Sequence, residues 1–323
     1  MTSIIRQFAF ALVLALPLSG AFAAEAYPSK PIHLLVPFPP GGATDSIARL
    51  VAQKLSDGLG QQVIVENRPG GGTIIATELA AKAPADGYTL LVVTAAFAVN
   101  PSLYPHLPYD SNKELTPVTL VSAAPNVLIV NPTVPANTVK ELIAYAKAHP
   151  HQVNFGSAGN GTSNHLAGEM FSTMAGVDIV HVPYKGDAPS ITDLLAGRIQ
   201  MLFIGYGPVA QYVKTGALRA IAISSAHPSA LVPGLPTIAE SGVPGFESAV
   251  WNGIVVPAQT PPAIINRLQS EIAKILAQPD THEKIVAMGF DPIGDSPAEF
   301  RAYLGAESQR LGKVVKDAGI HVD

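Results

Sequence analysis

The stretch HLLVPFPPGGATDSIARL, residues 33–50, decides the fold because it joins a β-favouring run to an amphipathic helix through a glycine turn. We expect a strand from His33 to Pro37 and a helix that begins near Thr44 or Asp45 and ends by Gly60. The helix is predicted by apolar residues at helical spacing, namely Ile47, Leu50, Val51, Leu55 and Leu59. A strand, a turn and a helix in this order are typical of a parallel α/β sheet.

The glycine turn can also bind an anion with its main chain. Glycine lets the backbone approach a ligand closely, and the free N–H groups of a helix N-terminus attract a carboxylate or a phosphate. Asp45 is a candidate too, although its carboxylate competes for the same N–H groups and could cap the helix instead. The candidate ligand-binding residues in this turn are Phe38, Pro39, Gly41, Gly42, Thr44 and Asp45.

A second turn of the same kind is FGSAGNGTSNH, residues 155–165. Ligands of α/β proteins bind beyond the carboxyl ends of strands, so two such turns from two lobes would form a cleft. The alternative is that these glycines only shape turns and that Thr162 and Ser163 only cap a helix. The candidates in this turn are Ser157, Ala158, Gly159, Thr162 and His165.

The rest of the chain repeats the alternation of strands and helices, and at 323 residues it exceeds the usual size of one core. We therefore expect an α/β fold of two lobes with two crossing strands. The predicted division is a signal peptide over 1–23, the first part of lobe 1 over 24–124, lobe 2 over 125–249, and a return to lobe 1 with terminal helices over 250–323. One strand is expected over 118–130, and further strands over 63–66, 88–93, 153–157, 179–182, 201–204, 219–224 and 250–256. Further helices are expected over 74–83, 163–175 and 189–196, after Thr138 and Thr260, and after Ser296.

The N-terminus predicts export. Arg6 precedes an apolar run from Phe8 to Leu18 and small residues over 19–24, which is a secretory signal with cleavage after Ala23 or near Ala26. That run is shorter than a membrane-spanning helix, which is the alternative. The chain has no cysteine, so it can form neither a disulfide nor a lipid anchor on cysteine. A net charge of −4 without a basic cluster argues against nucleic acid. We expect a monomer in the periplasm.

Several segments resemble the substrate-binding proteins of tripartite tricarboxylate transporters, the Bug family. They include YPSKPI at 27–32, PFPPGGATD at 37–45, ENRPGG at 66–71, APADGYTLL at 83–91, GTSNHLAGE at 161–169, VPYKG at 182–186 and LPTIAESGVPGF at 235–246. The resemblance implies a two-lobed, type II-like periplasmic-binding fold whose loops over 38–44 and 157–162 hold a carboxylate, partly through water. It also implies that residues 203–208 form a specificity wall. Here Ile204-Gly205 replaces an acidic pair, which favours a ligand without an ammonium group. Thr94, Tyr184, Gly205 and Tyr206 complete the candidate site.

The resemblance implies a binding protein that delivers a mono-, di- or tricarboxylate, possibly aromatic, to a membrane permease. The alternative is a receptor that presents the carboxylate to a sensor kinase. We expect no enzyme, no cofactor and no metal. An exported hydrolase with Ser157 as nucleophile and His165 as base is a further alternative, but Phe155 stands where a nucleophile elbow needs glycine. His165 and Glu169 could bind a metal from one helix, although the HExxH spacing is absent.

Overall fold

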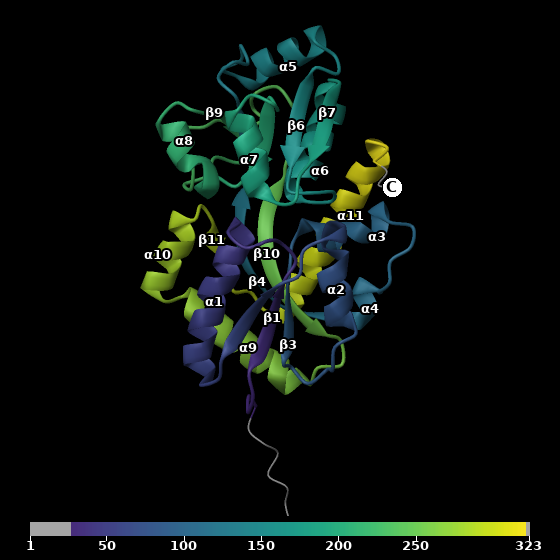
Figure 1. Cartoon of the computed structure of the whole chain (residues 1–323), viewed down its shortest axis with the longest axis vertical. Helices are drawn as coiled ribbons and strands as arrows, with labels where there is room; N and C mark the ends of the chain where they lie inside the picture. The colour runs from purple at the N-terminus through teal and green to yellow at the C-terminus, as the bar shows by residue number, and fades with distance from the viewer. Residues whose placement is uncertain (1–26, 321–323) are drawn as a thin grey trace, which may run out of the picture.

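The computed structural model describes residues 27–320 as two α/β lobes, drawn one above the other in Figure 1. The predicted signal peptide lies outside the described residues. Within 27–320, no helix combines the length and the apolar character that crossing a membrane requires.

Lobe 1 is built on a mixed six-stranded sheet with the order β11-β4-β10-β3-β1-β2. Strand β1 pairs in parallel with β2 and β3, whereas β10 runs antiparallel to β3 and β4. The strands are β1 (Ile32–Val36), β2 (Val63–Asn67), β3 (Thr89–Val93), β4 (Leu115–Pro125), β10 (Ala249–Pro257) and β11 (Asp291–Pro292). Its helices are α1 (Ala43–Leu59), α2 (Ile74–Ala81), α3 (Ala95–Leu103), α4 (Ser111–Glu114), α9 (Pro262–Leu276), α10 (Pro279–Ala287) and α11 (Pro297–Asp317).

Lobe 2 has a five-stranded sheet with the order β7-β6-β8-β5-β9. Strand β6 is parallel to β7 and β8, and β5 is antiparallel to β8 and β9. The strands are β5 (Val127–Val130), β6 (Val153–Ser157), β7 (Ile179–Pro183), β8 (Met201–Ile204) and β9 (Arg219–Ile223). The helices are α5 (Val139–Ala148), α6 (Ser163–Ala175), α7 (Asp187–Leu195) and α8 (Ala210–Lys214), with 3₁₀ turns at Gly71–Thr73 in lobe 1 and Gly207–Val209 in lobe 2.

The chain passes between the lobes at Asn126. The single strand predicted over 118–130 is therefore two strands, β4 and β5, with Asn126 between them. The division predicted between residues 124 and 125 lies one residue before the end of β4. Asn126 is buried, and its main-chain N–H donates to Ser224 Oγ at 2.7 Å. Its Nδ2 donates to Ser248 Oγ at 2.8 Å. The outgoing and returning segments are therefore tied together where they cross.

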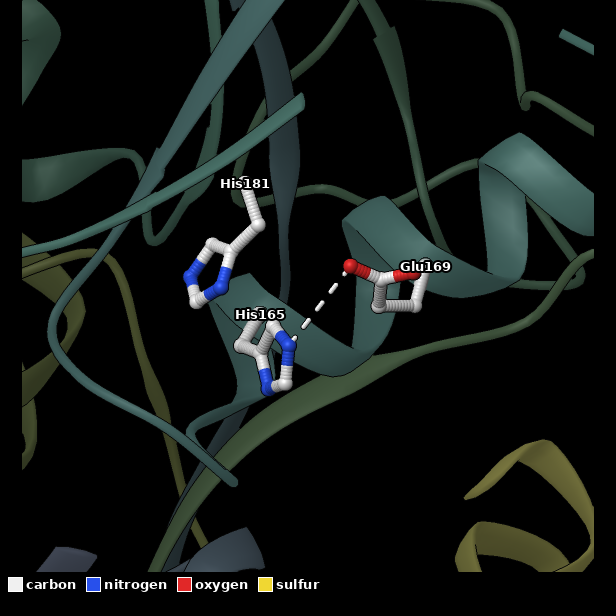
Figure 2. A group of neighbouring side chains, drawn as sticks. All are labelled: His165, Glu169 and His181. Atoms are coloured by element: carbon white, nitrogen blue, oxygen red, sulfur yellow. Dashed lines mark ion pairs between the residues drawn. The ribbon is translucent and has the colours of Figure 1, made fainter. Parts of the chain in front are cut away.

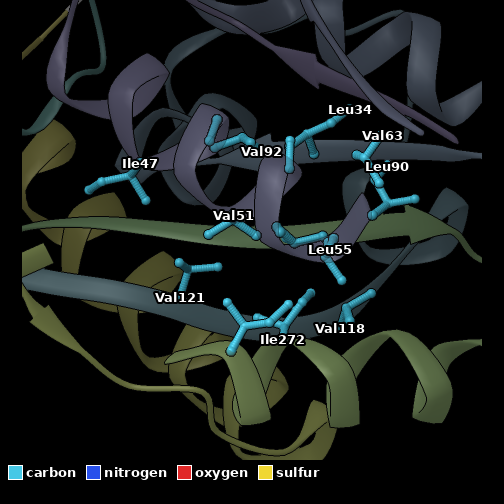
Figure 3. Packing of buried hydrophobic residues seen from close by; sticks show 14 of the residues in the cluster. Leu34, Ile47, Val51, Leu55, Val63, Leu90, Val92, Val118, Val121 and Ile272 are labelled. Atoms are coloured by element: carbon cyan, nitrogen blue, oxygen red, sulfur yellow. The ribbon is translucent and has the colours of Figure 1, made fainter. Parts of the chain in front are cut away.

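The core of lobe 1 explains the helical spacing in the opening stretch of sequence. Ile47, Val51 and Leu55 lie on one face of α1 and are at most 2% exposed, as are Leu34 on β1 and Ile272 on α9. Figure 3 shows these side chains packed between the sheet and the helices. Burying this apolar face holds α1 against the sheet, and its first turn therefore stands at the carboxyl end of β1.

Helix α11 connects the two lobes at the end of the chain. Ser296 caps it with a full capping box to Glu299, as the sequence predicts. Near its other end Val314 packs against the cores of both lobes. Arg310 Nη1 also donates to the main-chain oxygen of Glu247 at 2.9 Å, in the segment that leads back from lobe 2.

Candidate ligand-binding site

A pocket of about 110 Å³ lies between the lobes, where four helices begin. Helices α1 and α3 start at the pocket from lobe 1, and α6 and α7 start at it from lobe 2. Seven residues predicted from sequence line it, namely Phe38, Pro39, Gly42, Thr44, Thr94, Ala158 and Thr162. The two glycine turns thus meet at one site, although they are more than 100 residues apart in the chain.

None of these four helices has a side chain that caps its N-terminus. Their N-cap residues are Gly42, Thr94, Thr162 and Gly186, and none of them makes a side-chain cap hydrogen bond. Side chains cap α4, α5 and α11, which begin away from the pocket, whereas α2, α8, α9 and α10 also begin without a side-chain cap. The pocket is therefore lined by main-chain N–H groups and by the positive ends of four helix dipoles, which together favour an anion.

Asp45 holds the first glycine turn in shape and does not line the pocket. Its Oδ2 accepts hydrogen bonds from the Gly41 N–H and from Arg49 Nε, both at 2.9 Å. Its Oδ1 accepts from Asn67 Nδ2 at 2.8 Å. Burial alone would raise the pKa of Asp45, but the hydrogen bonds from Arg49, Asn67 and Gly41 lower it. The Asp45 carboxylate and the Gly41 N–H are thus engaged in hydrogen bonds that hold the loop to α1 and β2, and neither residue lines the pocket.

Ser157 and His165 support the second glycine turn in the same way. Ser157 is fully buried, and its Oγ lies 2.6 Å from His181 Nε2 and accepts a hydrogen bond from the Gly159 N–H at 3.1 Å. His165 is 2% exposed, and its Nδ1 accepts from the Gly161 N–H at 3.1 Å. Neither side chain lines the pocket. The serine contacts His181, not the His165 that the hydrolase alternative required.

His165, Glu169 and His181 form a cluster that could be taken for a metal site (Figure 2). The two imidazole rings stack with centroids 4.0 Å apart, and His165 Nε2 lies 3.6 Å from Glu169 Oε1. Because His165 Nδ1 accepts a hydrogen bond, a neutral His165 carries its proton on Nε2, the atom that a metal would need. Burial and the neighbouring His165 lower the pKa of His181 to about 3. The cluster therefore suits two neutral, hydrogen-bonded imidazoles.

A second cavity, of about 350 Å³, adjoins the pocket between the same two glycine turns. Gly159 and Tyr184 line this cavity and not the first one. Gly205 and Tyr206 line neither of the two. Gly205 faces Phe290 and Val250, and Tyr206 packs with the apolar side chains of lobe 2, so the predicted specificity wall does not coincide with the pocket.

Sequence reasoning missed several residues that line the pocket, chiefly Asn164, Asp187, Val250 and Trp251; Lys185 lines it as well. Asn164 lies in the first turn of a helix predicted correctly to begin at Ser163, so its place could have been inferred. Helix α7 was expected from Pro189 but begins at Asp187. Gly186 followed by an acidic residue was the available signal for that earlier start.

Two of the lining side chains have polar atoms without a partner in the described part of the chain. Thr94 is 8% exposed, and its buried Oγ1 makes no hydrogen bond. Asn164 is 6% exposed and donates from Nδ2 to the Phe203 main-chain oxygen at 2.6 Å, which leaves Oδ1 open. Buried polar groups are seldom left unpaired, so Thr94 Oγ1 indicates where a ligand contributes a hydrogen bond, and Asn164 Oδ1 is a further acceptor open to a ligand.

Comparison with known proteins identifies relatives over almost the whole chain. Protein BugT of Bordetella pertussis is 39% identical over 304 residues, which cover 94% of this chain and 93% of BugT. The solved structure of R. palustris Rpa4515 with adipate is similar with a TM-score of 0.87 and 37% identity, covering 91% of this chain and 99% of that one. The periplasmic binding protein BugD has a TM-score of 0.85 and 33% identity, covering 91% and 99%.

The model of the tripartite tricarboxylate transporter family receptor matches residues 47–320. This match includes the second glycine turn, both crossing segments and the terminal helices. The two-lobed α/β architecture agrees with that of the similar periplasmic binding proteins. The chain therefore belongs to the tripartite tricarboxylate transporter family of solute-binding receptors.

Proposed function

We propose that this protein captures a small organic carboxylate in the periplasm and delivers it to a membrane permease of the tripartite tricarboxylate type. The observation that carries the proposal is the convergence of four helix N-termini without side-chain caps on one pocket. Each helix end is equivalent to about half a positive charge, so the four ends attract an anion in addition to the charge of Lys185, which also lines the pocket.

The lining of the pocket suits an organic carboxylate. The lining is mixed, with Phe38, Val250 and Trp251 beside the helix ends, which suits an anionic group attached to an apolar body. The similar protein Rpa4515 was solved with adipate. The residues proposed to contact the ligand are the seven predicted ones that line the pocket, joined by Asn164, Lys185, Asp187 and Trp251.

The proposed role is binding without chemical turnover. Ser157 is the serine closest to a histidine in this region, but it is fully buried outside the pocket. A hydroxyl that cannot reach the ligand cannot act as its nucleophile. Incubating each ligand found below with the protein and following it by mass spectrometry checks this directly, because any converted product would contradict the binding role.

Thermal unfolding of the mature protein, stripped of co-purified ligand, tests carboxylate capture. The panel contains carboxylates with one, two or three acid groups, aliphatic and aromatic, each with its amide analogue. A ligand at 100 times its dissociation constant adds about 2.7 kcal/mol to stability, which corresponds to a shift of about 5 °C. A shift with an acid and none with its amide is the expected result. Equal shifts with both, or none across the panel, would contradict it.

A separate experiment tests the membrane partner. The purified protein, loaded with the ligand found above, is offered to vesicles that contain the cognate permease, and uptake of labelled ligand is measured. Uptake that depends on the protein supports delivery to a permease. Ligand-dependent phosphorylation of a sensor kinase, without such uptake, would instead support the signalling role.

A further inference from the structure

Asp187 is an acidic side chain in a pocket that otherwise favours anions. It is the first residue of α7 and lines the pocket from lobe 2. Among residues 27–320, the one hydrogen bond to its carboxylate is from Asn164 Nδ2 to Oδ1 at 3.4 Å, which is longer than usual. No cation pairs with Asp187 among residues 27–320, although Lys185 lines the same pocket. The carboxylate therefore keeps most of its capacity to accept hydrogen bonds.

Asn164 adds a second acceptor beside Asp187. Its Nδ2 donates to the main-chain oxygen of Phe203 at 2.6 Å, and this contact fixes which end of the amide is the nitrogen. The Oδ1 atom is left without a partner in the part of the chain that the structure describes, on a side chain that is 6% exposed. Two neighbouring acceptors thus line the pocket, and both can accept hydrogen bonds from a ligand.

The pocket is accordingly bipolar. The ends of all four helices supply N–H donors and Lys185 adds a positive charge, whereas Asp187, the first residue of α7, adds the one negative charge among the described residues that line the pocket. Burial raises the pKa of Asp187 to about 6, against a smaller opposite effect of the Asn164 hydrogen bond, so the group is still mainly ionised at neutral pH. A second carboxylate placed beside it would be repelled, and a donor group placed there would be attracted.

We propose that Asp187 and the Oδ1 atom of Asn164 select a carboxylate that also carries a hydrogen-bond donor, an ammonium or a hydroxyl group. The inference rests on the proposed capture of a carboxylate and names what the second end of the pocket recognises. It reverses the expectation drawn from Ile204-Gly205, because those residues do not line the pocket whereas Asp187 does.

Isothermal titration calorimetry at pH 7.5 tests the proposal with matched acids. The panel is butanedioate, pentanedioate, hexanedioate and benzoate, each in its unsubstituted, 2-hydroxy and 2-amino form. The titrations use the wild-type protein, Asp187→Asn and the control Asp57→Asn. Asp57 is an exposed carboxylate near the end of α1, far along the helix from the pocket. The Asp187→Asn side chain keeps the size of the original and removes its charge.

We expect the wild-type protein to bind the best substituted acid at least tenfold more tightly than its unsubstituted parent. This ratio should fall to within threefold of unity in Asp187→Asn and stay unchanged in Asp57→Asn. Unsubstituted acids that bind wild-type protein as tightly as the substituted ones would overturn the proposal, and so would a ratio that survives in Asp187→Asn. Binding of no acid by any of the three proteins would instead count against carboxylate capture itself.

Discussion

Replacing Thr94 with valine should stabilise the ligand-free protein and weaken its binding of ligand. The Oγ1 atom of Thr94 is buried and has no hydrogen-bond partner among residues 27–320, although the residue lines the pocket. Thr94 is the N-cap of α3, yet its side chain makes no cap hydrogen bond, so valine removes no existing interaction. The extended backbone of Thr94, with φ −138°, accepts a β-branched residue, and the two side chains have nearly the same shape.

The two effects have opposite signs and similar sizes. An unpaired buried polar group costs about 1 to 3 kcal/mol, so its removal should add about 1 kcal/mol to the free energy of unfolding. For a protein of this length that gain raises the midpoint by about 2 °C. A hydrogen bond from the hydroxyl to a charged ligand contributes about 1.5 kcal/mol, so its loss should weaken binding about tenfold.

Urea unfolding of the ligand-free protein and calorimetric titration of the ligand measure the two quantities. Thr281→Val is the matched control, because the Thr281 Oγ1 is also buried and has no partner in the described part of the chain, but lies in α10, outside the pocket. The control should gain stability and bind ligand as the wild-type protein does. A Thr94→Val protein that loses stability while its affinity is unchanged would refute the assignment of this hydroxyl to the ligand.

Lowering the pH from 7.5 to 5 should reduce the free energy of unfolding of the wild-type protein by about 2 kcal/mol more than that of His181→Phe, as measured by urea unfolding. The reason is that His181 gains a proton near pH 6.5 in the unfolded chain but only near pH 3 in the folded protein. Parallel pH profiles of the two proteins would contradict this. The emission of Trp251, the single tryptophan, should change on ligand binding because it lines the pocket, and unchanged emission at calorimetric saturation would count against that position. Gly168→Ala should lower the free energy of unfolding by about 1 to 3 kcal/mol, since its Cβ would lie 2.1 Å from the Phe155 ring. The control Gly305→Ala has open space around the new Cβ and should not destabilise the protein. Equal unfolding midpoints for the two variants would refute the packing argument.

Local sequence signals predicted the elements that carry the site with good accuracy. Strand β6, helix α6 and strand β8 have the bounds expected from sequence. In this region glycines mark the ends of the β-favouring runs, and polar residues mark the first turn of the helix. Helix α3 was not predicted, since Asn100 and Pro101 interrupt a short apolar segment that gives no helical period. Packing against α11 stabilises this helix, and such long-range support is invisible to local rules.

The site was predicted less completely than the fold, for a physical reason. The two glycine turns could be recognised because their chemistry depends on local main-chain geometry. The contact between Ser157 and His181 joins two strands that are neighbours only in the folded sheet, so spacing in sequence could not reveal it. Asp187 lines the pocket from the start of α7, and Trp251 lines it from the crossing strand β10. The division of the chain into lobes at the stated residues stays a prediction.

A pocket whose anion contacts are main-chain N–H groups has a consequence for how such proteins diverge. Substitutions other than proline leave those N–H groups in place, so mutation of the neighbouring side chains does not erase the capacity to hold an acid group. Asn164, Lys185 and Asp187 can then change after gene duplication while each copy keeps a working anchor. The main chain thus keeps the affinity for an acid group while the neighbouring side chains change the selectivity. Duplicated copies can therefore acquire new ligands without first losing the ability to bind one.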